Sequence, residues 1–276
     1  MKNVLIQSGK AFCYFLLFLG MQVIVNFVFQ FIYGFKLGLE MAASGKGMDV
    51  QFVTDKLMEF ILDNTNWIVL ISGLLTLVVL WVFFKIRKKK LHQEAGIHKF
   101  DRKFILPLIG LGIALSFFVS SVLTLLPIPE SIMEDYLTES SVLENGGVIL
   151  RILSIVIMAP VVEEVVFRGL ILSRLKKAMD CRIAILISSL LFGIIHGQVL
   201  WMAYAFVLGI VLALVAERTK STGAAIALHL LFNLMGIFGE FFYFSLTQTI
   251  IVGVISAIMI VCFGYYMLKA KKVQVV

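Results

Sequence analysis

Long apolar runs limit what this sequence can fold into more than any other feature. Of its 276 residues, 61% are hydrophobic and only 15% are charged, against roughly 45–50% and about 25% in ordinary soluble domains. The hydrophobic residues occur in stretches of about twenty, the length that a helix needs to cross the hydrocarbon core of a bilayer. We therefore expect an all-α, polytopic membrane helix bundle.

Eight stretches are candidate transmembrane helices. They are residues 11–35, 66–84, 104–126, 147–172, 183–198, 200–216, 222–244 and 249–268. Only a turn near Gly197 and Gln198 separates the fifth from the sixth, so one long bent segment is the alternative. The first stretch lacks an A-x-A-like cleavage site and is expected to be a retained span, not a signal peptide. We divide the chain into an N-terminal part with helices 1–3, residues 1–146, and a core with helices 4–7 and a final helix, residues 147–276.

The basic residues are distributed unevenly between alternate loops. With the N-terminus inside, 20 of the 24 Lys and Arg residues fall on the cytoplasmic side, and the others are Lys36, Lys46, Lys56 and Arg151. By the positive-inside rule, this bias predicts a multi-pass plasma-membrane protein with both termini in the cytoplasm. The net charge of +7 then reflects topology and anionic lipid headgroups, and no nucleic-acid partner is expected. None of the three cysteines forms a CxxC pair, so neither a disulfide framework nor a cysteine metal site is expected.

Charged side chains lie inside the fourth stretch, where each costs roughly 2.5–3.5 kcal/mol on insertion scales. The segment APVVEEVVFRG carries Glu163, Glu164 and Arg168. On a helix, Glu164 and Arg168 are four residues apart on one face, and we expect them to form an ion pair. Glu163 points about 100° away from Glu164. It is left as the free carboxylate and is a candidate general base.

The fifth stretch, SSLLFGIIHGQ, carries a histidine. Phe192 and His196 are four residues apart and therefore share one face of a helix. Phe192 is expected mainly to pack. Gly193 and Gly197 form a small-xxx-small pair, which would let a neighbouring helix approach closely.

The seventh stretch, AIALHLLFN, carries a second histidine and an amide. His229 and Asn233 are again four residues apart. If each stretch is centred in the bilayer, Glu163, His196 and His229 fall within a few residues of its middle. Costly polar side chains from three helices at one depth predict a shared intramembrane site. The alternative is that the histidines and Asn233 are only hydrogen-bond partners between helices.

The three motifs together resemble those of a known family. EEVVFR fits the pattern EExxxR, FGIIH fits FxxxH and HLLFN fits HxxxN, in the order found in the CPBP family of intramembrane proteases, also called the Abi family. The resemblance covers about residues 147–244. It implies an all-helical membrane endopeptidase of the CAAX-protease type, or one with a bacteriocin-processing or self-immunity role. The site residues that it implies are Glu163, Glu164, Arg168, His196, His229 and Asn233.

The resemblance also implies roles for these residues. Glu163 and His196 would activate a water molecule, and His229 with Asn233 would support the water or the oxyanion. The family has been described both as metal-dependent and as glutamate-type, so a zinc ion held by Glu163, His196 and His229 stays an alternative. The missing HExxH pattern and the poor ligand quality of Asn233 argue against zinc. The expected partners are a protein or peptide substrate, in or at the membrane, and the lipid bilayer.

Two functions of other classes also fit the polar residues. Intramembrane Glu, Arg and His side chains occur in proton-coupled transporters, whose two halves often carry matching features. The first half of this chain shows no matching polar cluster, which counts against that function. A non-catalytic membrane immunity or scaffold protein is the other alternative.

Overall fold

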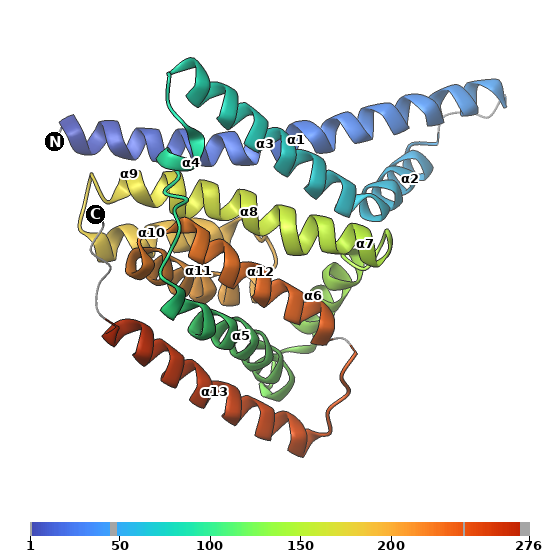
Figure 1. Cartoon of the computed structure of the whole chain (residues 1–276). Helices are drawn as coiled ribbons and strands as arrows, with labels where there is room; N and C mark the ends of the chain where they lie inside the picture. The colour runs from blue at the N-terminus through green and yellow to red at the C-terminus, as the bar shows by residue number, and fades with distance from the viewer. Residues whose placement is uncertain (1, 45–48, 240, 271–276) are drawn as a thin grey trace.

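The computed structural model describes residues 2–44, 49–239 and 241–270 (Figure 1). Within these ranges the chain forms helices and no strand, which confirms the all-α membrane bundle. Three lysines of the charge argument, Lys46, Lys271 and Lys272, lie outside the described residues.

The helices follow one another along the whole chain. The N-terminal part holds α1 (Lys2–Ala43), α2 (Val50–Asp63), α3 (Thr65–Ile86), α4 (Leu91–Glu94), η1 (Arg102–Phe104), α5 (Ile105–Leu125) and α6 (Glu130–Val142). The remainder holds α7 (Gly147–Arg151), η2 (Ile152–Met158), α8 (Ala159–Glu164), η3 (Val165–Leu172), α9 (Ser173–Leu175), α10 (Cys181–Ile194), α11 (Val199–Thr219), α12 (Thr222–Gly239) and α13 (Leu246–Lys269). The elements α7 to α9 continue without a break as one helix, residues 147–175, which we call the central helix; η2 and η3 are its π-helical segments.

Six helices among the described residues are long and apolar enough to cross a membrane, so the expected number of eight is not confirmed. They are α1, α3, α5 with η1, α11, α12 and α13. The central helix is long, but its α-helical geometry is interrupted by η2 and η3. The helix α10 has only 14 residues, about 21 Å at 1.5 Å per residue, which is shorter than the hydrocarbon core of about 30 Å.

The helices α10 and α11 are separate, and a tight turn joins them. Gly197 in this turn has a φ of 71°, a left-handed conformation that favours glycine. A Cβ at Gly197 would meet nothing within 4 Å, so the prediction that Gly193 and Gly197 form a packing pair is wrong. Gly193 and, on α11, Gly209 bring the two helices together, since a Cβ at Gly193 would lie 2.9 Å from the carbonyl oxygen of Met202 and one at Gly209 would lie 3.1 Å from Cβ of Ser189.

The central helix lies inside the bundle (Figure 1). The helices α1 and α3 pack on one side of it, α10 and α12 pack on the other, and α5 and α13 follow beyond α12. Buried aromatic side chains of α1 join the same core as the central helix: the rings of Phe15 and Phe18 meet the ring of Phe167 edge-on. The division of the chain at residues 146 and 147 stays a prediction.

The start of α1 and the end of α13 lie on the same side of the bundle (Figure 1). This arrangement fits termini that share one face of a membrane. The chain is a multi-pass membrane protein; its placement in the plasma membrane and the cytoplasmic location of its termini stay predictions.

Candidate active site

The adjacent glutamates lie at the end of α8, and their side chains diverge. The side chain of Glu164 is 0% exposed, whereas that of Glu163 is 14% exposed and lines a cavity. Successive residues on a helix point about 100° apart. One carboxylate therefore turns into the packed core and the other into the cavity, as the spacing predicts.

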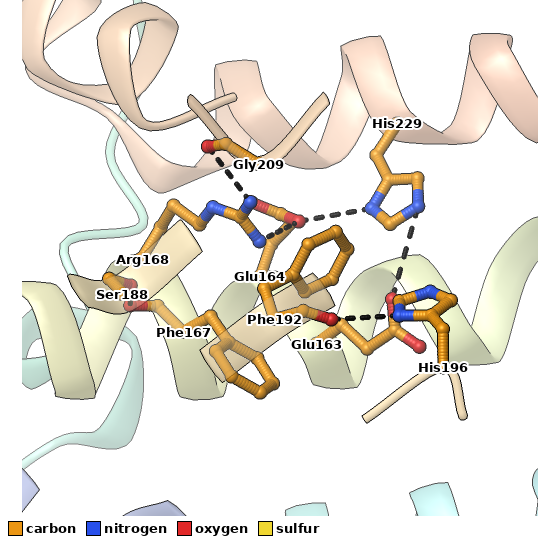
Figure 2. Close-up of polar contacts among 9 residues, drawn as sticks. All are labelled: Glu163, Glu164, Phe167, Arg168, Ser188, Phe192, His196, Gly209 and His229. Atoms are coloured by element: carbon orange, nitrogen blue, oxygen red, sulfur yellow. Dashed lines mark hydrogen bonds and ion pairs between the residues drawn. The ribbon is translucent and has the colours of Figure 1, made fainter. Parts of the chain in front are cut away.

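Arg168 fixes the buried glutamate in place. Its Nη1 lies 2.7 Å from Oε1 of Glu164, and its own side chain is 1% exposed. Its Nη2 donates a hydrogen bond of 3.1 Å to the carbonyl oxygen of Gly209 on α11. Its guanidinium carbon lies 4.2 Å from the ring centre of Phe192, a cation–π distance. The predicted ion pair is present, and it also joins the central helix to α10 and α11 (Figure 2).

His229 contacts the same glutamate. Its Nδ1 lies 3.0 Å from Oε1 of Glu164, and its Nε2 lies 3.9 Å from Oε2 of Glu163. A carboxylate only accepts hydrogen bonds, so Nδ1 carries the hydrogen and Nε2 presents a lone pair toward Glu163. The distance of 3.9 Å is too long for a direct hydrogen bond. It is short enough for one water molecule to bind both atoms.

His196 reaches the site from the turn after α10, because that helix ends at Ile194. The expectation that this histidine lies within a membrane helix is therefore wrong. Its Nδ1 lies 2.7 Å from the carbonyl oxygen of Phe192. A carbonyl oxygen can only accept, so Nδ1 carries the hydrogen and Nε2 is the unprotonated nitrogen. The ring is half-buried and lines the same cavity as Glu163.

Phe192 is the packing centre of the site. Its side chain is completely buried. Its ring meets Phe167, His196 and His229 edge-on, at centroid distances of 5.3, 4.9 and 5.8 Å. Figure 2 shows the ring between Arg168 and the two imidazoles. The packing role expected for Phe192 is confirmed, and its contacts orient both histidine rings.

Asn233 bonds to the backbone of the central helix. Its Nδ2 donates a hydrogen bond of 2.8 Å to the carbonyl oxygen of Ile155. In η2 the bonds run five residues back, since the N–H of Ala159 bonds to the carbonyl oxygen of Ser154. The next donor would be Pro160, which has no N–H. Asn233 thus satisfies a carbonyl group that the π-helical register leaves unpaired, and its role toward water or the oxyanion stays a prediction.

One cavity of about 1080 Å³ brings four of the candidate side chains together: Glu163, His196, His229 and Asn233 all line it. The other two candidates, Glu164 and Arg168, are buried in the packed core behind the residues that line the cavity. Small-molecule pockets usually measure about 300–1,000 Å³, so this cavity is large enough for a stretch of peptide.

The possible zinc ligands do not form a metal-binding geometry. Across residues 2–44, 49–239 and 241–270, no group of three or more His, Cys, Asp or Glu side chains is arranged to hold a metal ion. The Nδ1 atoms of His196 and His229 already make hydrogen bonds, to Phe192 and Glu164. Metal-ligating histidines make such hydrogen bonds through one ring nitrogen while the other binds the ion, so a zinc ion held by Glu163, His196 and His229 stays a prediction.

Two features of the site were missed in the sequence. The contact between Glu164 and His229 depends on how α12 is rotated against the central helix, and no local spacing encodes that rotation. Three amide side chains of α1 also line the cavity, namely Gln22, Asn26 and Gln30. Their spacing of four residues within an apolar run could have revealed them.

Comparison with known proteins finds a family that is similar to the part of the chain that builds this site. Residues 145–235 match the family described as "Type II CAAX prenyl endopeptidase Rce1-like". This segment is therefore similar to the CPBP family of intramembrane proteases. The matched segment includes all six candidate site residues, from Glu163 to Asn233.

A curated relative is also similar to part of the chain. The "Putative membrane peptidase YdiL" of Bacillus subtilis (strain 168) is 34% identical to this chain over 77 residues. The aligned part covers 28% of this chain and 32% of the relative, so the chain spans about a third of the length of the curated relative. No solved structure matches the chain significantly.

Proposed function

We propose that this chain is a membrane endopeptidase of the glutamate type, which hydrolyses a peptide bond inside its cavity. The observation that carries this proposal is the facing pair of Glu163 and His229, with 3.9 Å between Oε2 and Nε2, in the wall of a cavity that His196 also lines. The CAAX-type family match of residues 145–235 supports it.

The first step is activation of water. A water molecule bound between Glu163 and His229 gives one proton to the Glu163 carboxylate, while its oxygen attacks the scissile carbonyl carbon. His229 Nε2 accepts the second hydrogen of the water and so fixes its orientation. Glu164 holds the ring of His229 in this tautomer through the Nδ1 hydrogen bond of 3.0 Å. The position of the His229 ring is thus set before the substrate arrives.

The second step is collapse of the tetrahedral intermediate. The protonated Glu163 returns its proton to the amide nitrogen of the leaving peptide, the C–N bond breaks, and a carboxylic acid and an amine are released. His196 orients the water or relays a proton through its Nε2. Asn233 keeps a second hydrogen on Nδ2, with which it stabilises the oxyanion; the loss of such a donor costs about 10²–10³ in rate in other enzymes.

The substrate must be an extended segment, because the carbonyl groups of a helix are already hydrogen-bonded. The family description favours CAAX-type protein or peptide substrates. Processing of bacteriocin leaders, or a role in self-immunity, uses the same chemistry and belongs to the same proposal.

Glu163→Gln tests the mechanism, because it keeps the size of the side chain and removes the base. Quantitative terminal proteomics on membranes that contain either protein should detect new peptide ends with the wild type only. His229→Ala should have the same effect, with insertion retained. The matched control is Glu59→Gln on α2, an exposed carboxylate that pairs with Lys56 outside the cavity, and it should leave cleavage unchanged. Cleavage by Glu163→Gln at the wild-type rate would refute the proposal.

A further inference from the structure

Three amide side chains form a row on one face of α1. Gln22, Asn26 and Gln30 follow one another at intervals of four residues, and residues so spaced lie above one another on a helix. All three line the cavity that contains Glu163. On the other faces of this part of α1, Ile24 and Val28 are exposed and lie outside the cavity lining.

The row has unused hydrogen-bonding capacity. Gln30 Nε2 donates a hydrogen bond of 2.6 Å to Asn26 Oδ1. Among the described residues, Gln22 has no hydrogen-bond partner. Each amide side chain provides two N–H donors and one acceptor oxygen, and polar groups inside a membrane need partners or a wet cavity. The row can therefore bond to a ligand that both donates and accepts.

The spacing of the row matches an extended peptide. Four residues of an α-helix rise about 6.0 Å, and alternate residues of an extended strand are about 6.6–6.8 Å apart. The difference of less than about 1 Å per step is within the reach of flexible Gln and Asn side chains. In an extended chain, every second residue presents its backbone N–H and C=O toward the same side. Successive amides of the row can thus bond to alternate residues of one peptide.

The row begins close to the candidate catalytic residues. Phe18, one turn before Gln22, is 2% exposed. Its ring meets Phe167 edge-on at 5.7 Å, and Phe167 meets Phe192 at 5.3 Å. Phe192 in turn contacts His196. A buried chain of aromatic rings therefore fixes the position of α1 relative to the catalytic wall of the cavity.

We propose that Gln22, Asn26 and Gln30 bind the backbone of the peptide substrate in an extended conformation, as a track along the cavity wall. This inference rests on the endopeptidase function proposed above and adds a substrate-binding site to it. Because the track bonds to backbone groups, it selects an unwound chain and is indifferent to most of the sequence. It thereby supplies the partners that the substrate backbone loses when its helix unwinds.

Binding is tested without cleavage in the Glu163→Gln protein. The probe is a fluorescently labelled, farnesylated peptide that ends in a CaaX sequence, and its Kd is measured by fluorescence anisotropy in detergent. Since one hydrogen bond contributes modestly to affinity, each of Gln22→Ala, Asn26→Ala and Gln30→Ala should raise the Kd about two- to tenfold. The triple variant should raise it more than any single one. The matched control is Gln7→Ala, an amide of the same helix that does not line the cavity, and it should leave the Kd unchanged.

Peptides with N-methyl groups on alternate backbone nitrogens give a sharper test, because methylation removes the N–H donors of one edge. One of the two alternating sets should bind more weakly to the protein with an intact track, and this difference should vanish in the triple variant. Size-exclusion chromatography checks that the triple variant is folded.

Three results overturn the track: equal Kd values for the intact and triple-variant proteins, a difference between methylated sets that survives in the triple variant, or no binding of the peptide by Glu163→Gln. Failure of the endopeptidase function has a separate signature, namely equal cleavage by wild type and Glu163→Gln in the membrane assay.

Discussion

Arg168→Ala should destabilise the fold strongly, because Arg168 is the buried cation beside Glu164. Both side chains are almost completely inaccessible, at 1% and 0% exposure, and their closest atoms are 2.7 Å apart. Without the guanidinium, Glu164 stays buried with a charge and only His229 as a partner.

The expected loss follows from three contacts. Removing one partner of a buried ion pair costs about 3–5 kcal/mol. The cation–π contact with Phe192, at 4.2 Å, contributes up to about 2 kcal/mol where it is desolvated. The carbonyl group of Gly209 also loses its donor, at about 1 kcal/mol. These effects overlap, and we expect a total loss of about 4–6 kcal/mol in the free energy of unfolding.

The assay is equilibrium unfolding of the purified protein in detergent, by steric trapping, with folded yield from size-exclusion chromatography. Replacing both partners, as Glu164→Gln with Arg168→Met, should cost clearly less than the two single changes added together, because no lone charge remains. The control is Lys56→Ala, which removes an exposed ion pair of the same 2.7 Å length on α2 and should change nothing measurable. Wild-type stability of Arg168→Ala, or simple additivity in the double variant, would refute the reasoning.

Other predictions follow from single contacts. Asn233→Ala should lower the free energy of unfolding by about 1–3 kcal/mol in the same unfolding assay, because the carbonyl group of Ile155 loses its partner. His196→Ala should abolish cleavage in the terminal-proteomics assay while the protein still inserts, because His196 lines the cavity; unchanged cleavage would remove it from the mechanism. The hydrogen bond from Lys89 holds the pKa of Glu94 below its ordinary value. The stabilisation that this hydrogen bond provides is therefore complete above the unfolded pKa of about 4.3 and is lost as the pH falls through the folded pKa. In the Glu94→Gln variant, the free energy of unfolding should no longer show this part of the pH dependence.

The features that the sequence predicted well are local ones. The helical membrane class follows from the length and polarity of the apolar runs. The pair of Glu164 and Arg168 follows from a spacing of four residues, which sets a shared face on any helix. The divergence of Glu163 from Glu164 needs only the rotation per residue. Each of these inferences depends on one segment at a time.

The features that the sequence predicted poorly depend on how separate segments of the chain pack together. The π-helical segments beside Pro160 could not be read from the apolar run, although they determine which carbonyl group Asn233 must satisfy. The end of α10 at Ile194 carries no composition signal, so His196 was placed inside a helix. Gly197 was interpreted as a packing residue because a sequence does not display a positive φ.

The amides of α1 were overlooked for a different reason. Gln22, Asn26 and Gln30 are neutral, so they lack the charge that marks Glu163 and Arg168 as costly within an apolar run. An uncharged amide still needs a partner in a bilayer. The sequence signal for the row is the common helical face that a spacing of four residues gives these three amides.

Two hydrogen bonds between α12 and the central helix limit how the cavity can open. His229 bonds to Glu164, and one turn further along α12 Asn233 bonds to Ile155. Two attachment points on one helix prevent both rotation about its axis and sliding along it, unless a bond breaks. An outward swing of α12 would break the His229 bond that sets up the proposed catalytic pair. A tilt of the part of α1 beyond its buried Phe18, where most large side chains are exposed, would leave both bonds intact. Entry of a substrate past α1 therefore leaves the hydrogen bonds of His229 and Asn233 intact, whereas entry past α12 would first have to break at least one of them.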